Sequence, residues 1–268
     1  DPGALLGRRL GIEPRTTVTT TVGGNSPQLL VNELAAEVAR GDARAVLIGG
    51  AECVYTRWRA RREPKTWLDW TQADDPPCAR VLGDPRPGTN DYEMAHTAVA
   101  PTQIYPLFET ALRAEAGRTI DEHQREVSEL WAMFAAAAAG NPYAWSQVPY
   151  SPEEIRTPAA DNRVVTFPYL KRMCANIDVD EAAALLVCSY DLARDLGVPD
   201  DRLVFPLAAA DAHDRFFFSE RESLTASPAI AAAGSAALDE AGIGIDDVAR
   251  FDLYSCFPSA VEIALGAL

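Results

Sequence analysis

Histidine is scarce in this sequence, and its cysteines are neither paired nor regularly spaced. There are 3 histidines and 5 cysteines in 268 residues, and no C-x-x-C pair is present. An odd number of scattered cysteines predicts neither a disulfide framework nor a zinc site. The histidines (His96, His123 and His213) do not stand at ligand spacing either. We therefore expect no metal centre.

Basic residues and long apolar runs are also few. The 24 Lys and Arg against 39 Asp and Glu give a net charge of −15, which would repel phosphates, so we expect no nucleic-acid partner. One anionic small ligand would still fit, because it needs only a local basic patch. Apolar runs are far below the ~20 residues of a membrane span, and no stretch resembles a secretory leader. These absences predict a cytoplasmic protein without a membrane span.

The stretch Thr16–Glu52 has the pattern of a βαβ unit. A β-branched run, Thr16–Val22, precedes a Gly-Gly turn, and a helical stripe then ends at Gly41. The apolar run Arg44–Gly49 follows, as expected of a strand buried on both faces of a parallel sheet. The turn would open at a helix N-terminus, where free N–H groups favour a nucleophile or a bound anion. The stripe consists of Leu30, Leu34 and Val38.

The remaining chain divides by character into an insert and a second α/β part. Residues 56–166 contain an Arg- and Trp-rich stretch, including Trp67 and Trp70, and then helical patterns, the clearest beginning at a Thr119 capping box. The α/β rhythm resumes at Phe167. We predict segments of 1–55, 56–166 and 167–268. In the last, the patterns predict strands at Asp180–Cys188, Arg202–Ala208 and Phe251–Phe257, and a helix starting at Ser227.

Several residues are candidates for chemistry or binding. Ser26 has the G-x-S context of a nucleophile elbow without its closing glycine, so it fits a helix N-cap better than a nucleophile. Arg57 and Arg59 flank Trp58, and together they could hold a phosphorylated planar ligand, since guanidinium binds phosphate bidentately; a solvated basic loop is the alternative. Tyr254 stands at the end of a predicted strand, where α/β proteins place ligand sites.

Two further pairs of residues have both a structural and a chemical interpretation. Cys256, like Tyr254, could be reactive, or both could be buried packing residues. His213 beside Asp214 could form an oriented acid/base pair, although a histidine in a charged loop is common. We place His123 on the polar side of its helix.

Four stretches in order resemble the thiolase superfamily, in its branch near the sterol-carrier-protein-type thiolases. They are Val18–Val38 followed by VLIGGAE, the Asn141-Pro142-Tyr143-Ala144 segment, Cys174–Val187, and the strand ending FDLYSCFP. The resemblance implies a thiolase-like α/β fold: two similar layered halves and an inserted, mostly helical loop domain. It also implies a coenzyme A thioester as substrate or ligand, held partly by Arg57–Arg62, and no tightly bound cofactor.

Departures from the family pattern concern its catalytic residues. Gly24 stands at the position of the nucleophilic Cys, so no covalent acyl-enzyme can form there. Tyr254 stands where these enzymes have an Asn or His, Ser255 replaces an acidic residue, and Cys256 matches a packing position. The first strands and the final Gly-His-Pro and Cys-x-Gly motifs are expected outside Asp1–Leu268, as if the chain were part of a longer protein.

Three functions are compatible with this resemblance. The first is an acyl-CoA-binding protein of the acetyl-CoA acetyltransferase family without ordinary thiolase turnover. The second is a retro-aldol lyase on a β-hydroxyacyl-CoA in steroid side-chain or lipid degradation, with Tyr254 as acid/base, because that reaction needs no nucleophile. The third is a non-catalytic thiolase-fold partner, so a homo-oligomer or an accessory subunit or domain are the expected assemblies.

Overall fold

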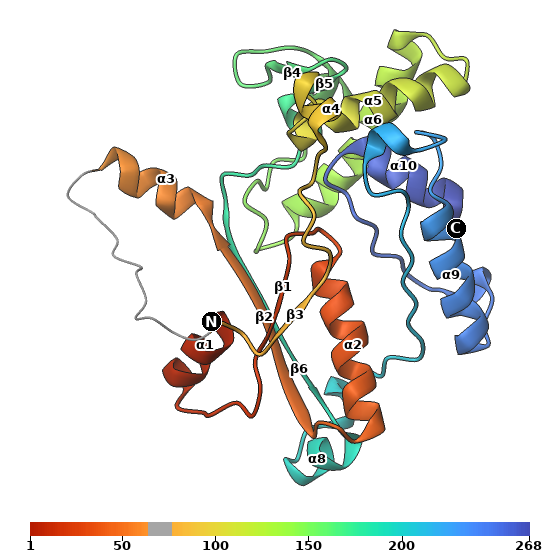
Figure 1. Ribbon diagram of the computed structural model, residues 1–268. Coiled ribbons are helices and arrows are strands. Elements are labelled where there is room, and N and C mark those ends of the chain that lie inside the picture. Colours follow the sequence, from red (N-terminus) through yellow and green to blue (C-terminus); the bar gives the residue numbers. More distant parts are fainter. Residues whose placement is uncertain (64–76) are drawn as a thin grey trace. The chain divides into compact units, whose positions relative to one another are not determined.

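The computed structural model describes residues 1–63 and 77–268, which form two compact units (Figure 1). Unit 1 consists of Asp1–Arg86 and Ile177–Leu207, and unit 2 of Pro87–Asn176 and Ala208–Leu268. Each unit thus combines an early and a late part of the chain. The predicted segments of 1–55, 56–166 and 167–268 stay a prediction. Trp67 and Trp70 lie outside the described residues.

Unit 1 is built around two long paired strands with a helix beside them (Figure 1). Helix α2 starts at Ser26, one residue earlier than a Ser26 N-cap would place it, and ends at Gly41, whose φ of 80° is the left-handed conformation that favours glycine. The elements are α1 (Pro2–Leu10), β1 (Val18–Thr20), α2 (Ser26–Arg40), β2 (Ala45–Cys53), α3 (Val54–Arg62), β3 (Arg80–Leu82), β6 (Asp180–Cys188), α8 (Tyr190–Asp195) and η2 (Asp200–Arg202).

The pairing of β2 corrects one expectation from the sequence. The strand itself is confirmed, but it pairs antiparallel with β6, from Ala45 opposite Cys188 to Cys53 opposite Asp180. Within the described residues β1 pairs with β3, in parallel, and not with β2. Only Ile48 of β2 is buried, and Leu186 of β6 is 62% exposed, so the expected burial on both faces is also wrong. Apolar composition alone does not distinguish parallel from antiparallel partners.

Unit 2 is mostly helical. The Thr119 capping box is present, with the Thr119 side chain accepting from the Glu122 amide, and Ser227 caps α9 as predicted. The elements are α4 (Asp91–Ala95), α5 (Pro101–Glu115), α6 (Ile120–Ala139), α7 (Pro152–Arg156), β4 (Val164–Thr166), β5 (Tyr169–Leu170), η1 (Lys171–Met173), η3 (Phe218–Glu220), α9 (Pro228–Ala241), η4 (Ile245–Asp247) and α10 (Pro258–Ala267). Among the described helices, none is both long and apolar enough to span a bilayer.

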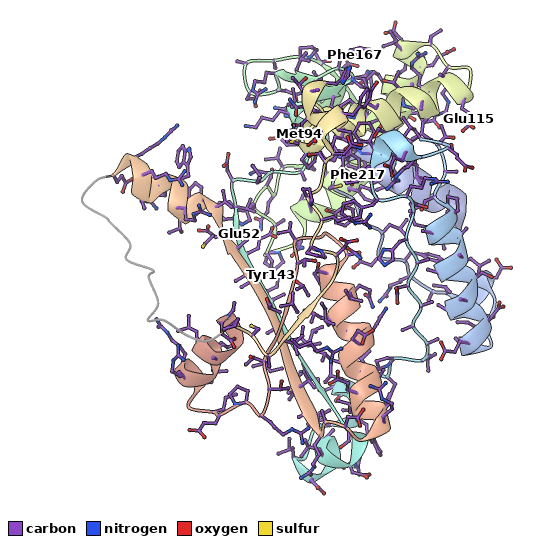
Figure 2. All side chains as sticks on the ribbon, viewed as in Figure 1. Glu52, Met94, Glu115, Tyr143, Phe167 and Phe217 are labelled. Atoms are coloured by element: carbon purple, nitrogen blue, oxygen red, sulfur yellow. The ribbon has the colours of Figure 1, made fainter. Side chains whose placement is uncertain are left out.

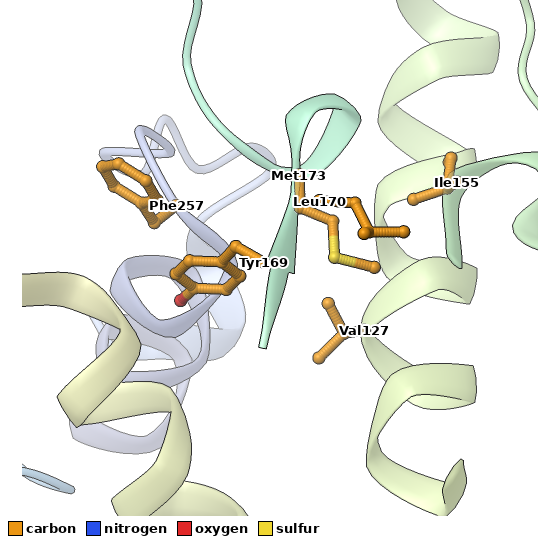
Figure 3. Close-up of a cluster of buried hydrophobic side chains, with 6 residues drawn as sticks. All are labelled: Val127, Ile155, Tyr169, Leu170, Met173 and Phe257. Carbon is orange, nitrogen blue, oxygen red and sulfur yellow. The ribbon is translucent and has the colours of Figure 1, made fainter. Parts of the chain in front are cut away.

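The core of unit 2 is a cluster of six buried side chains from five places in the chain (Figure 3). Tyr169 of β5 stacks on Phe257, the residue before α10, with ring centroids 5.4 Å apart, and Val127 of α6 belongs to the same cluster. Burial of such side chains contributes about 1.5–3 kcal/mol each. The members are Val127, Ile155, Tyr169, Leu170, Met173 and Phe257.

Two predicted strands are absent from the described structure. Arg202–Ala208 begins in η2 and continues as unpaired backbone, and Phe251–Phe257 is irregular up to α10. Val204 is 91% exposed. A β-branched, aromatic-rich sequence favours extended backbone, but a strand also needs a hydrogen-bonded neighbour, which the described residues do not supply.

Candidate functional site

Tyr254 lies four residues before α10, in a group of three side chains with exchangeable protons. The Tyr254 hydroxyl and the Tyr105 hydroxyl of α5 both lie close enough to the Cys256 thiol to interact with it electrostatically. Tyr254 is 58% exposed, whereas Tyr105 and Cys256 are half-buried. The solvent-exposed phenol of Tyr254 is thus followed by the Cys256 thiol and the Tyr105 phenol, which lie further inside unit 2.

The protons of this group are held tightly. Burial raises the pKa of Tyr254, and the neighbouring Cys256 adds to the rise. Burial likewise raises the pKa of the Cys256 thiol and of Tyr105. All three groups are therefore protonated at neutral pH, and Cys256 is not a reactive thiolate. The group can donate hydrogen bonds or a proton to an oxygen placed at Tyr254.

Aromatic packing fixes the inner part of the site. The Tyr105 ring stacks on Phe257 with centroids 4.5 Å apart and planes 18° apart. The Cys256 carbonyl accepts a 3.0 Å bond from the Ala175 amide. Tyr105 was not among the candidates predicted from the sequence. Its spacing of three residues from Phe108 on the same helix is the signal that would have placed it on the inner face.

The turn before α2 differs in detail from the expectation. Asn25, not Ser26, is the N-cap, and its side chain makes no capping bond. The Ser26 hydroxyl donates to the Thr21 carbonyl at 3.1 Å, so it is neither the predicted N-cap nor paired with a base. The Ser26 amide donates to the Gly23 carbonyl, and Pro27 has no amide proton. The turn therefore offers fewer free N–H groups than its sequence suggested.

Gly24 is exposed in this turn, in unit 1, whereas Tyr254 belongs to unit 2. That the two positions share a pocket stays a prediction. Gly24 is not among the glycines of positive φ, so an L side chain could adopt its backbone conformation.

Gly24→Cys is expected to create a thiol with a pKa below the usual value of about 8.5, because it would sit at the start of α2. The measurement is the pH dependence of alkylation of that cysteine, followed by peptide mass spectrometry. Gly50→Cys is the matched control, since Gly50 lies in β2 with open space around its Cβ position. Equal midpoints for the two thiols would contradict an activating turn.

The basic residues proposed for coenzyme A lie on α3, which continues directly from β2; Glu52, labelled in Figure 2, marks the end of that strand. Arg57, Trp58 and Arg59 are all exposed. Trp58 stacks on Tyr55, with centroids 5.9 Å apart, and the Arg62 guanidinium lies 4.0 Å from the indole centroid. A planar ligand stacking on Trp58 would have to compete with these neighbours.

His213 and Asp214 do not form an acid/base pair, which leaves the alternative of a histidine in a charged loop. His213 is exposed, and its nearest carboxylate is Asp211 at 3.9 Å. Asp214 instead accepts a 2.6 Å bond from the Ser227 hydroxyl and a 3.1 Å bond from the Ala229 amide. It stabilises the start of α9.

His123 is buried, which corrects its predicted place on the polar side of the helix. Only 1% of it is exposed, and its Nε2 lies 2.5 Å from Glu109 Oε1. Glu262 lies nearby on α10, where burial raises the pKa of its carboxyl to about 7, with the Glu109 charge adding to the rise. A histidine between carboxylates on helical elements was not visible from sequence spacing.

The chain is similar to known proteins of the thiolase-like type. No protein-family model matches the sequence. An acetyl-CoA acetyltransferase of Methanocaldococcus jannaschii is 23% identical over 255 residues, 95% of this chain and 57% of that protein. A monomeric SCP2-thiolase-like protein type 1 from Mycobacterium smegmatis superposes with a TM-score of 0.80 and 34% identity, over 98% of this chain and 50% of the other. The chain is thiolase-like.

A second solved structure with a similar fold is that of an aldolase. The Ltp2–ChsH2(DUF35) aldolase superposes with a TM-score of 0.58 at 19% identity, over 99% of this chain and 69% of that one, a likeness of fold alone. The predicted thiolase-like α/β fold is thus confirmed. This thiolase-like chain spans about half the length of the proteins in the two closer comparisons, at 57% and 50%.

Proposed function

We propose that this chain is an acyl-CoA-binding protein of the acetyl-CoA acetyltransferase family that does not carry out ordinary thiolase turnover. Gly24 carries this proposal, because a side chain of one hydrogen offers no nucleophile at the turn where the family resemblance places a cysteine. The raised pKa of Cys256 supports it, since that thiol is no substitute thiolate. The similarity to an acetyl-CoA acetyltransferase provides the ligand class.

Binding is proposed to use the arginines of α3. Arg57 and Arg59 are exposed there, and Arg59 is engaged only by Glu63 at 3.5 Å among the ion pairs of the described residues. That pair is solvent-exposed and on the order of 0.3–0.5 kcal/mol, so a phosphate could replace it. Guanidinium groups are suited to the phosphates of coenzyme A because they bind them bidentately.

Arg57→Glu is expected to weaken acyl-CoA binding at least about tenfold, because a charge-assisted hydrogen bond contributes about 1.5–3 kcal/mol and the reversal adds repulsion. Isothermal titration calorimetry with acetyl-CoA measures it. Arg40→Glu is the matched control, since Arg40 is an exposed arginine of unit 1 that pairs with Asp42. Equal affinity of the Arg57→Glu variant and the parent would show that Arg57 has no part in acyl-CoA binding.

A retro-aldol lyase is the second candidate, and the neighbouring side chains of Tyr254, Cys256 and Tyr105 favour it. In this reaction the β-hydroxyl loses its proton to a base while the Cα–Cβ bond breaks. Its electron pair becomes a thioester enolate, which then takes up a proton. Tyr254 would serve one of the two proton transfers, with the Cys256 thiol beside its phenol. The fold shared with a protein described as an aldolase is in accord with this chemistry.

The third function is that of a non-catalytic partner. The aldolase neighbour is described together with a second component, ChsH2(DUF35). By analogy, this chain would act beside an accessory subunit or domain, or as a homo-oligomer. An acyl-CoA complex that neither cleaves nor transfers the acyl group would rule against the lyase, and a stable complex with such a partner would favour this third function over the first.

A further inference from the structure

Three helices of unit 2 bring an imidazole and two carboxylates to one place. Glu109 comes from α5, His123 from α6 and Glu262 from α10, and Figure 1 shows these helices in the same region of unit 2. One ligand atom of each residue lies within 4.8 Å of the other two. Glu109 is fully buried and His123 is 1% exposed. Buried charged side chains are rare unless they are paired or coordinate a metal.

A ring of neighbouring groups holds Glu109 in position. Its Oε2 accepts a 2.5 Å bond from the Tyr169 hydroxyl, which lies 2.8 Å from Ser259 Oγ. Its Oε1 is 2.5 Å from His123 Nε2. Hydrogen-bonded supports of this kind orient the ligands in metal sites.

Negative charge exceeds positive charge around the cluster. The carboxylates that face it are Glu109, Glu262 and Glu126, and the groups of opposite influence are His123 and Arg118. Arg118 is already bonded to Glu126 at 2.7 Å, and its second nitrogen lies 3.4 Å from His123 Nδ1. A second cation would offset the remaining repulsion between Glu109 and Glu262.

A cavity of about 770 Å³ opens beside the cluster. Glu262 and Arg118 line it on the polar side, and Leu130, Met133 and Leu265 on the apolar side. It gives an entry path and room for water molecules as additional ligands. The cluster is therefore accessible from Glu262 and closed behind Glu109.

We propose that Glu109, His123 and Glu262 bind a divalent transition-metal cation of the Zn²⁺ class. One imidazole nitrogen with two carboxylate oxygens suits zinc, whereas Ca²⁺ and Mg²⁺ prefer oxygen ligands alone. With bonds of about 2.0–2.2 Å, tetrahedral ligand atoms lie about 3.3–3.6 Å apart. The His123–Glu109 hydrogen bond must open by about 1 Å, and His123 Nε2 must release its proton to the solvent.

The test is calorimetric titration of the full chain with Zn²⁺, together with the visible spectrum of the Co²⁺ complex. Glu262→Gln keeps the shape of the side chain, removes a ligand charge at the accessible end, and is expected to lower Zn²⁺ affinity at least tenfold. Glu129→Gln is the matched control, because Glu129 lines the same cavity but is not one of the three ligands. It should leave the affinity within about threefold.

Folding of each variant is checked by circular dichroism, and His123→Gln provides a second ligand substitution where it folds. Spectra typical of tetrahedral or five-coordinate Co²⁺ with nitrogen and oxygen ligands support the site. Thiolate-to-cobalt bands in the near ultraviolet would place the metal on cysteines instead and overturn it. Equal Zn²⁺ affinity of the parent and the Glu262→Gln variant, or no binding by the parent, would also overturn it.

Discussion

Tyr254→Phe should lower the rate of β-hydroxyacyl-CoA cleavage by about 10²–10⁴-fold, the usual loss when an acid/base group is removed. The variant deletes the one exposed hydroxyl of the Tyr254, Cys256 and Tyr105 group and leaves the ring in place. Cleavage is measured by the appearance of the carbonyl product, with the acyl-CoA in excess. A loss in kcat with an unchanged KM would indicate a role in proton transfer and not in binding.

Tyr143→Phe is the matched control for this experiment. Tyr143 is also a tyrosine of unit 2, but it is 90% exposed, and the same loss of a hydroxyl there should leave the rate unchanged. If the parent chain is active and Tyr254→Phe retains full turnover, Tyr254 has no part in the chemistry. Tyr105→Phe should have a smaller effect than Tyr254→Phe, because Tyr105 acts through Cys256.

Glu109→Ala should destabilise unit 2 by about 3–5 kcal/mol, the range found when one member of a buried, hydrogen-bonded charged pair is removed. The change leaves His123 and the Tyr169 hydroxyl without their carboxylate partner in a dry environment. Hydrogen exchange of the α6 amides measures this loss in unit 2 alone.

Glu129→Gln again supplies the control, since Glu129 is an exposed residue of α6 and surface substitutions usually change stability by less than about 0.5 kcal/mol. A cost of Glu109→Ala below about 1 kcal/mol would show that water reaches His123 and replaces the lost partner. The buried network would then be looser than its distances indicate.

Local signals predicted the helices well, because the atoms that determine helix ends lie within one turn. Thr119 and Ser227 cap their helices as their sequences indicate, and Gly41 and Gly242 end helices in the left-handed conformation. The strand Asp180–Cys188 was also predicted at its observed limits. The helix ends depend on residues that are neighbours in the chain, whereas the strand also needs its distant partner β2.

Partners that are distant in the sequence could not be predicted in the same way. Nothing in the apolar run of β2 specifies β6 as an antiparallel neighbour, and nothing near Arg202–Ala208 shows whether a neighbour exists. The candidate site shows the same difference between residues identified from the local sequence and residues whose roles depend on distant contacts. Tyr254 was identified from its position after a predicted strand, whereas Tyr105 and Glu109 have their roles only because α5 packs against α10.

The pairing of β2 with β6 has a consequence for how the protein is made. On the ribosome β2 emerges first, and the entire early part of unit 2, Pro87–Asn176, must be synthesised before β6 exists to pair with it. The loop that this pairing closes is long, which makes it entropically costly and slow. Meanwhile α5 and α6 can form from local contacts, while β2 exposes an unpaired apolar edge open to aggregation. Chaperone dependence should therefore arise from unit 1, during the interval between β2 and β6.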